Sequence, residues 1–287
     1  MKIGFIGGGK VGISLGMYFL SKGNIISYYH RKGSSISSKT KNMNDIVYYR
    51  KLDDIIRFNN IVFITTKDDI ISDVIGEISN INVINNKQVF IHTSGSISSH
   101  IFSPLADIGC GCYSLHPLMT FSDHNVPLHI IENTSFTLEG NKKNYGLIKS
   151  FLKNAHINYY EINPDDKILY HAAACIMCNY LVTLLDSGYT ILKEIGFDEN
   201  FSKEIFKPLI NTTLDNIYKK GCAKSLTGPI SRGDEKTIQS HINAISKHTP
   251  EYFDLYKTLG ISTIEMIKKE MNKNDIHNNI IKLLRGE

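Results

Sequence analysis

Three glycines near the start of the chain have the spacing of a loop that binds phosphate groups. Gly7, Gly9 and Gly12 follow a short apolar segment and open a stretch with helical spacing. In such a loop the first glycine permits a tight turn, the second lets the backbone approach a pyrophosphate, and the third lets the helix pack on the strand. Lys10 and Val11 open the helix, whose first N–H groups would face the phosphates. The spacing therefore predicts a dinucleotide site.

The residues about 20 positions further on predict which dinucleotide is bound. A site for NAD usually has a carboxylate there, which bonds the ribose hydroxyl. This chain instead has His30 and Arg31, with Ser34 shortly after them, and so offers cations and a hydroxyl to a 2′-phosphate. We therefore expect NADP(H), with Arg31 as the main contact. A solvated basic turn is the alternative interpretation.

Polar loops follow three further apolar segments. Thr65 and Thr66 come after one of them, Thr93 and Ser94 after the next, and His116 after a third. Ligands of open α/β sheets bind outside the carboxyl ends of the strands, so we expect these side chains to face the nicotinamide end of the dinucleotide. For His116 the alternative is a loop histidine that bonds only the backbone.

Short apolar segments alternate with helical patterns in the first half of the chain, which is typical of a parallel sheet with right-handed crossovers. The expected strands are residues 2–6, 25–29, 47–49, 61–65, 89–92, 113–115 and 135–138. After residue 162 the pattern is helical, and Asn163 and Pro164 have the residue types of a helix cap and a first helical position. The expected helices there are 164–195, 201–219, 235–246, 251–270 and 275–284. The sequence thus predicts an α/β fold class, with a Rossmann-type parallel-sheet domain over 1–162 and an all-helical domain over 163–287.

Composition argues against several other classes of protein. The net charge of +4, from 32 basic and 28 acidic residues without a dense basic tract, argues against a nucleic-acid partner. We find no unbroken run of about 18 apolar residues and no signal-peptide pattern, and so expect no membrane partner. We expect a cytoplasmic protein with reduced thiols that acts on a small molecule. The five cysteines have no zinc-like spacing, so we expect no metal site.

Six motifs together resemble a known family. They are GFIGGGKVG, TTKDDII, IHTSGSIS, SLHPLMTF, YHAAACIMCNYL and LTGPISRGDEKT, and they span about residues 1–270. The chain resembles Rossmann-like proteins with a second domain long of unknown function, whose helical part is similar to the C-terminal domains of the 6-phosphogluconate dehydrogenase superfamily. Some members resemble an alternative type of ketopantoate reductase, and others carry only a general label of NADP oxidoreductase. One departure is Lys67, which stands where the family pattern would have proline.

The resemblance also implies which side chains act on the substrate. In hydroxyacid dehydrogenases and ketopantoate reductases an analogous helix carries a Lys-x-x-x-Asn pair, in which lysine donates a proton or polarises the carbonyl and asparagine orients the substrate. Lys167 and His171 have this spacing, with histidine in place of asparagine, and Asn179 lies further along the same helical stripe. His116 resembles a histidine of prephenate dehydrogenases that engages the substrate hydroxyl. Arg232 is the candidate to bind a substrate carboxylate.

A structural role is the alternative for each of these side chains. Lys167 would then be a solvated residue of a first helical turn, and His171 would be a core or cleft-wall histidine. Asn179 would cap a backbone group. Arg232 would belong to a connection between helices, paired with an aspartate.

These residues lead to three functional hypotheses. The first is NADPH-dependent reduction of a small 2-keto acid, with Lys167 as general acid and 2-dehydropantoate, an intermediate of pantothenate biosynthesis, as the expected substrate. The second is an imine reductase or a prephenate-type dehydrogenase on the same scaffold. The third is a non-catalytic NADPH-binding sensor, because a fold alone never proves catalysis. The resemblance also implies a homodimer that pairs through the helical domain.

Overall fold

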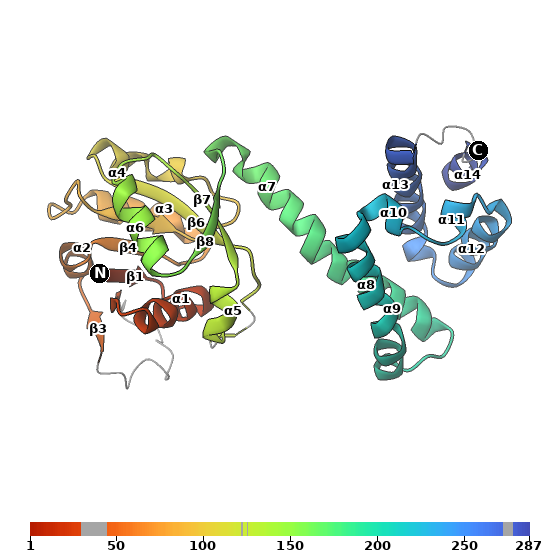
Figure 1. Ribbon diagram of the computed structural model, residues 1–287, viewed down its shortest axis with the longest axis horizontal. Helices are drawn as coiled ribbons and strands as arrows, with labels where there is room; N and C mark the ends of the chain where they lie inside the picture. The colour runs from red at the N-terminus through yellow and green to blue at the C-terminus, as the bar shows by residue number, and fades with distance from the viewer. Residues whose placement is uncertain (30–44, 122, 125, 272–277) are drawn as a thin grey trace. The chain divides into compact units, whose positions relative to one another are not determined.

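The computed structural model describes residues 1–29, 45–121, 123–124, 126–271 and 278–287. They form two compact units, Met1–Cys175 and Ile176–Glu287 (Figure 1). The division falls inside the long helical segment and not at its start, where the sequence boundary of 162/163 would place it. The reason is that Lys167 and Tyr170, from the first turns of that segment, bond side chains of the sheet in the first unit.

The first unit is built on one sheet of eight strands, in the order β3-β2-β1-β4-β5-β6-β7-β8. The strands are β1 Lys2–Ile6, β2 Ile25–Tyr29, β3 Ile46–Tyr49, β4 Ile61–Ile64, β5 Val89–His92, β6 Gly111–Pro117, β7 Ser135–Gly140 and β8 Asn158–Glu161. Neighbouring strands are parallel except β6 and β7, which are antiparallel. The expected α/β class is confirmed, with this pair as the departure from a wholly parallel sheet. Between β6 and β7 the described residues form only the short helix α5, Leu128–Glu132, whereas a parallel crossover usually contains a full helix.

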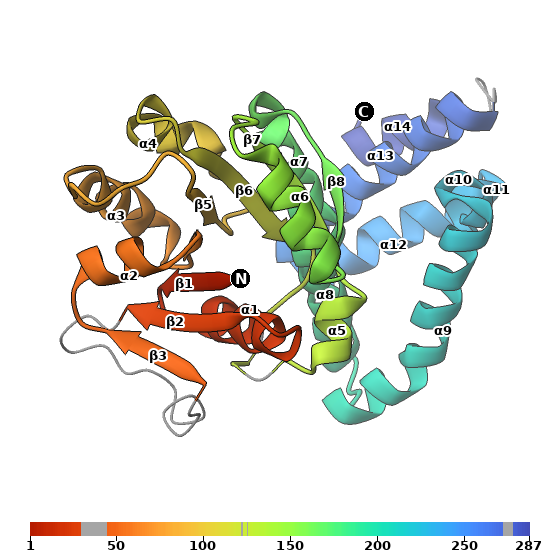
Figure 2. The ribbon, with the colours of Figure 1, turned by 60° about the vertical axis from the view of Figure 1, so that its left-hand side comes forward.

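Helices cover both faces of the sheet (Figure 2). Helices α1, Lys10–Ser21, and α6, Tyr145–Asn154, pack on one face together with α5. The other face is covered by α2 Leu52–Phe58, α3 Asp68–Ser79 and α4 Ser103–Asp107. Successive residues of β1 accordingly enter opposite cores, Phe5 on the first face and Ile6 on the second. This double cover buries the strands and leaves their carboxyl ends to form a site.

The long helical segment begins as expected and then changes its geometry. The Asn163 side chain accepts a hydrogen bond from the Asp165 N–H and caps a turn at Pro164–Asp166. Helix α7, Lys167–Ala174, follows and lies wholly in the first unit. A π-helical stretch, Cys175–Asn179, then leads into α8, Tyr180–Glu194. The sequence predicted an unbroken helix here, because a π-turn has no residue signature of its own.

The second unit is helical in all the elements that the structure describes, as expected. After α8 it contains α9 Glu199–Lys220, α10 Cys222–Ser225, α11 Pro229–Arg232, α12 Glu235–His248, α13 Phe253–Met271 and α14 Asn278–Arg285. Ile238 of α12, Ile264 of α13 and Leu284 of α14 are fully buried together. These three helices therefore have a core of their own.

The stretch Pro164–Glu194 is long and apolar enough to cross a membrane by length and composition, with a mean hydropathy of 1.7. It contains no unbroken run of about 18 apolar residues, because Asn179 and Asp186 interrupt the pattern. Ile176 and Val182 lie in this stretch and are exposed. It therefore presents apolar surface that the described residues do not cover.

Gly16 gives a test of how tightly α1 packs on the sheet. A Cβ atom at this position would overlap the hydroxyl oxygen of Tyr28, which is fully buried and donates to the Gly12 carbonyl at 3.0 Å. Gly16→Ala should therefore lower the free energy of unfolding by about 1–3 kcal/mol, measured by urea denaturation. Gly76→Ala is the control, because an added Cβ in α3 would meet no atom within 4 Å and should not destabilise the protein. Equal losses in both variants would contradict this account of α1.

Candidate active site

The glycine-rich loop has the backbone that its spacing predicts. Gly7 has a φ of 117°, and a Cβ there would lie 2.6 Å from the backbone of Thr65. A Cβ at Gly12 would overlap the Gly7 carbonyl oxygen, so α1 starts in direct contact with the turn. Gly9, the N-cap of α1, has open space where a Cβ would stand. The loop thus combines a tight turn, close packing and one open position.

The surroundings of this loop fit the phosphates of a dinucleotide. The Thr65 hydroxyl donates to the Gly7 carbonyl at 2.8 Å and ties the end of β4 to the turn after β1. The Thr66 hydroxyl is buried without a hydrogen-bond partner, so it is free to bond a ligand oxygen. Helix α1, which opens with exposed Lys10 and half-buried Val11, has no acidic residue in its first turn, and its N-terminal dipole favours an anion. Three of the expected cofactor contacts lie outside the described residues: His30, Arg31 and Ser34.

The loop after β5 is tied to the start of α3. Ser94 and Ser96 both donate their hydroxyls to Asp68 Oδ2, at 2.7 and 3.1 Å, and Thr93 next to them is half-buried. The hydroxyl of Ser94, which we expected to face the cofactor, is therefore engaged within the protein. Lys67, the residue before α3, has φ −63° and ψ 152°, which are values that proline also adopts. The departure at Lys67 thus keeps the backbone that proline would impose.

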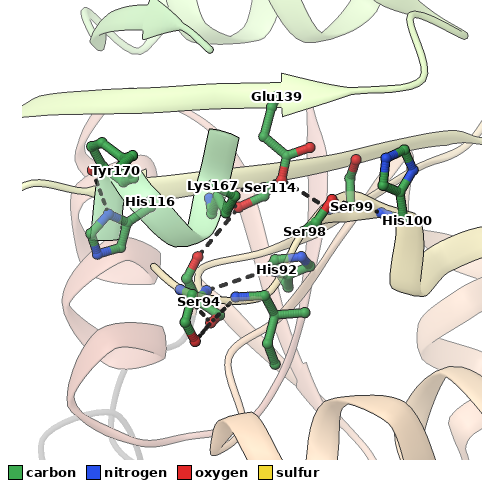
Figure 3. A network of polar contacts seen from close by, with 12 residues as sticks. His92, Ser94, Ser98, Ser99, His100, Ser114, His116, Glu139, Lys167 and Tyr170 are labelled. Atoms are coloured by element: carbon green, nitrogen blue, oxygen red, sulfur yellow. Dashed lines mark hydrogen bonds and ion pairs between the residues drawn. The ribbon is translucent and has the colours of Figure 1, made fainter. Parts of the chain in front are cut away.

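A polar layer lies between the sheet and α7 (Figure 3). In β5, β6 and β7 every second side chain points away from the core that lies under α1 and α6. The polar layer contains five of these side chains: His92, Ser114, His116, Thr137 and Glu139. The strand register places Ser114 beside His92 on one side and beside Glu139 on the other. Helix α7 contributes Lys167, which bonds Ser114, and Tyr170, which bonds His116. The site is therefore made of strand ends and one helix within the first unit.

Lys167 is fully buried and has two partners from the sheet. Its Nζ donates to Ser114 Oγ at 2.5 Å and lies 3.8 Å from Glu139 Oε1. The Ser114 hydroxyl donates in turn to the Ser94 carbonyl at 3.3 Å. Burial lowers the pKa of Lys167 to about 8, against the opposing attraction of Glu139 and Asp68. A group with this pKa gives and takes a proton near neutral pH, as general acid catalysis requires.

Two imidazoles meet beside Gly95. A Cβ at Gly95 would lie 2.5 Å from His171 Nδ1 and 2.8 Å from His116 Nε2, so only glycine leaves room for both rings. His116 Nδ1 shares a hydrogen bond of 2.7 Å with the Tyr170 hydroxyl. Burial, with repulsion from Lys167 and then His171, lowers the pKa of His116 to about 4. The His116 ring is therefore neutral near pH 7 and can form hydrogen bonds without supplying a proton.

Asn179 is separated from Lys167 and His171 by a change of helix type. It ends the π-helical stretch, in which the hydrogen bonds span one residue more than in an α-helix, so the segment from His171 to Asn179 does not have the period of a regular α-helix. Asn179 is also exposed and belongs to the second unit. The helix that the sequence predicts as regular is thus interrupted between His171 and Asn179, and the role of Asn179 stays a prediction.

Arg232 ends α11 in the second unit and is exposed. The next turn contains Gly233 in the left-handed region, at φ 71°, and then Asp234. Asp234 caps α12 by accepting from the Thr237 N–H at 3.1 Å and from the Thr237 hydroxyl at 2.7 Å. The motif thus has a clear role in joining two helices, and it leaves the Arg232 guanidinium at the surface.

The cysteines are free thiols in the structure. Burial raises the pKa of Cys110 to about 11 and, with a contribution from Cys110, that of Cys112 to about 12, so both remain protonated. Among the residues that the structure describes, no group of three or more His, Cys, Asp or Glu side chains could hold a metal ion.

Sequence reasoning missed Glu139, Tyr170 and Gly95. Glu139 could have been found from the sequence, because it is a charged residue in a strand of alternating apolar residues. A charge that is buried in this way needs a partner. Tyr170 and Gly95 had none, because their roles come from contacts with residues far away along the chain.

Comparison with family models matches both parts of the chain. Residues 1–117 match a Rossmann-like domain, and residues 134–263 match a domain of unknown function, DUF2520. The chain combines a Rossmann-like domain with a DUF2520 domain. The resemblance stated from the sequence motifs is thereby confirmed. The DUF2520 match begins next to β7, so Glu139 and Lys167 lie within the same matched domain.

Solved structures share the fold over nearly the whole chain. Protein TM1727 from Thermotoga maritima is 24% identical, with a TM-score of 0.72 over 94% of this chain and 99% of its own. Protein BF3122 from Bacteroides fragilis is 20% identical, with a TM-score of 0.70 over 92% and 98%. The reductive aminase of Aspergillus terreus, in complex with NADPH and ethyl-5-oxohexanoate, is 9% identical, with a TM-score of 0.68 over 99% and 98%. No curated protein matches the sequence.

The protonation of His116 gives a test of the polar layer. In histidine-labelled protein, nuclear magnetic resonance should show a neutral His116 ring until the pH falls to about 4. Lys167→Met removes a repelling cation and should raise the pKa of His116. Lys142→Met, which removes an exposed cation paired with Glu161, should leave that pKa unchanged. A wild-type ring that titrates near the ordinary 6.5 would show that His116 is not buried as described.

Proposed function

We propose that this protein is an NADP(H)-dependent oxidoreductase that reduces a small 2-keto acid, with 2-dehydropantoate as the first substrate to test. The observation that carries the proposal is Lys167, a fully buried lysine with a pKa of about 8 in the layer between the sheet and α7. Carbonyl reduction needs a proton donor for the oxygen on which negative charge develops. A buried lysine with this pKa supplies that proton close to neutral pH.

NADP(H) as the cofactor is supported by the glycine-rich loop and by the NADPH in the Aspergillus reductive aminase. When bound, NADPH supplies the hydride. The α1 N-terminus and the Thr66 hydroxyl would hold its phosphates. We expect the 2′-phosphate to be bonded by Arg31 and Ser34, with His30 beside them.

In the proposed step Lys167 Nζ donates one proton to the carbonyl oxygen while the hydride reaches the carbonyl carbon. The products at these atoms are a hydroxyl group and a neutral lysine amine. Because Lys167 has no exposed surface, a neighbouring segment has to move aside for the substrate, and we propose that this is the loop at Ser94 and Gly95. His171 Nδ1 is buried without a hydrogen-bond partner and would bond the substrate beside neutral His116.

Asn179 and Arg232, which the sequence predicts to bind the substrate, stay candidate contacts. Both are exposed, so neither has to give up a buried contact to bind a ligand. An arginine binds a carboxylate with two parallel hydrogen bonds, which suits a 2-keto acid. Asn179 offers both an amide donor and a carbonyl acceptor for orienting the substrate.

Imine reduction is the second candidate. The fold shared with the Aspergillus reductive aminase favours it, at a TM-score of 0.68. A buried lysine and a neutral histidine suit an imine as well as a ketone. In both reductions the hydride goes to the carbon of the double bond, and one proton is needed on its oxygen or nitrogen. The two functions are separated by the substrate that is turned over.

The proposed function predicts NADPH oxidation when 2-dehydropantoate is added, at a turnover of roughly 1–1000 per second. Lys167→Ala should lower kcat by about 10²- to 10⁴-fold and leave NADPH affinity unchanged, because Lys167 acts only on the proton. Lys142→Ala, at an exposed lysine, is the matched control and should keep wild-type turnover. Turnover should fall as the pH rises through about 8, because the donor must be protonated and Lys167 loses its proton there.

NADH serves as the control for the cofactor and a cyclic imine as the control for the substrate. Faster turnover with NADH would contradict the role of Arg31. Turnover of the imine alone would move the protein to the second candidate. Unchanged kcat in Lys167→Ala would show that another group donates the proton.

We also propose that a second copy of the chain covers the apolar surface of residues 164–194. Ile176 and Val182 are 61% and 69% exposed there. A bilayer is a poor partner for this stretch, because it contains Asp186 and because Lys167 at its start is packed on the sheet. Light scattering in detergent-free buffer should give the mass of two chains, and Val182→Arg should shift it toward one. A single-chain mass for the wild type, or aggregation relieved only by detergent, would contradict the dimer.

A further inference from the structure

Glu139 is a buried acidic residue that the proposed reaction step does not use. Its side chain has no exposed surface, although it lies in a strand whose other buried residues are mostly apolar. Oε1 accepts the Ser99 N–H at 2.9 Å and faces Lys167 Nζ at 3.8 Å. Oε2 is buried without any hydrogen-bond partner. A carboxylate that is only partly satisfied in a protein interior is costly, so its presence calls for an explanation.

Four titratable groups face Lys167 from the elements packed around it. His92 on β5 and His116 on β6 have pKa values of about 3 and about 4, mainly because both are buried, so both are neutral at pH 7. Asp68 at the start of α3 is exposed, and water weakens its attraction. Glu139 on β7 is fully buried, and its attraction raises the pKa of Lys167 more than that of Asp68 does. Among the described groups, Glu139 therefore acts most strongly on the ammonium.

The ammonium is held from two sides. Ser114 Oγ accepts from Nζ, and Glu139 Oε1 faces Nζ from the adjacent strand, because the antiparallel register pairs Ser114 with Glu139. A neutral lysine amine would lose the charge attraction to Glu139. The carboxylate therefore both orients Nζ and favours its protonated form.

From this geometry we propose that Glu139 is a positioning residue that keeps Lys167 protonated between turnovers and so sets the upper pH limit of the reaction. The inference rests on the proposed function, in which Lys167 donates the proton. After that donation the amine is neutral, and the unchanged Glu139 carboxylate favours its reprotonation by solvent. The competing explanation is that the pair only ties α7 to β7, which would affect stability and not the pH profile.

The test is the pH dependence of kcat in Glu139→Gln, which keeps the shape of the side chain and removes its charge. The pH at which kcat falls to half should move down by about 1–3 units, because a nearby opposite charge shifts a pKa by that amount. At pH values below the new limit kcat should approach the wild-type value, and the KM for NADPH should not change. Glu161→Gln is the matched control, because Glu161 is an acidic residue of β8 that pairs with exposed Lys142. A Glu139→Gln profile equal to that of the wild type would overturn the proposal.

A second measurement needs no turnover. Lysine-labelled protein gives the Lys167 Nζ titration by nuclear magnetic resonance, and its midpoint should fall in Glu139→Gln by the same 1–3 units. A shifted midpoint without any turnover would support the role of Glu139 while the proposed function fails. An unshifted midpoint would overturn the role of Glu139 even if the protein reduces keto acids.

The wild-type protein provides the test if Glu139→Gln does not fold. The carboxyl carbon resonance of Glu139 should then show a step at the pH where Lys167 titrates, because the two charges face each other at 3.8 Å. The absence of a step at that pH would overturn the proposal.

Discussion

A buried lysine needs a partner of opposite charge, and much of the first unit is arranged around this constraint. Lys167 belongs to a helix, yet its Nζ meets side chains from two strands of the sheet. An ammonium group without exposed surface is tolerated only where hydrogen bonds and a countercharge offset the loss of water. Ser114 and Glu139 supply both from β6 and β7. The start of α7 therefore packs with the sheet, and the units divide after Cys175.

The antiparallel pairing of β6 and β7 brings the two partners of Lys167 together. In this register Ser114 lies opposite Glu139 and His116 lies opposite Thr137, so the polar side chains of both strands form one layer. The apolar residues between them enter the first core with α1 and α6. The DUF2520 match begins at residue 134, immediately before β7. The strand that carries the countercharge and the helix that carries the lysine thus lie in one family domain, although they pack on strands of the Rossmann-like one.

The sequence predicted those parts of the fold that depend on local geometry. The strands up to β5, the turn at Gly7 and the cap at Asn163 each follow from hydrophobic period, backbone freedom or residue type within a few positions. Strand β8 was not predicted, because its Tyr160 and its neighbours are mostly exposed and lack an apolar pattern. Lys167 was found as a candidate through the family resemblance, but its burial was not foreseen. That burial depends on Glu139, and no local rule joins two residues on different elements.

The loop after β5 links the start of α3 to Lys167 through hydrogen bonds. Ser94 bonds Asp68 through its hydroxyl and Ser114 through its carbonyl, and Ser114 holds Lys167. Next to it, Gly95 leaves the space into which the two histidine rings point. A substrate that displaces this loop must therefore weaken the Ser94–Ser114 hydrogen bond, and the Ser114 hydroxyl is then free to turn. In the proposed reaction, movement of this loop would therefore change the hydrogen bonding of the Lys167 ammonium through Ser114.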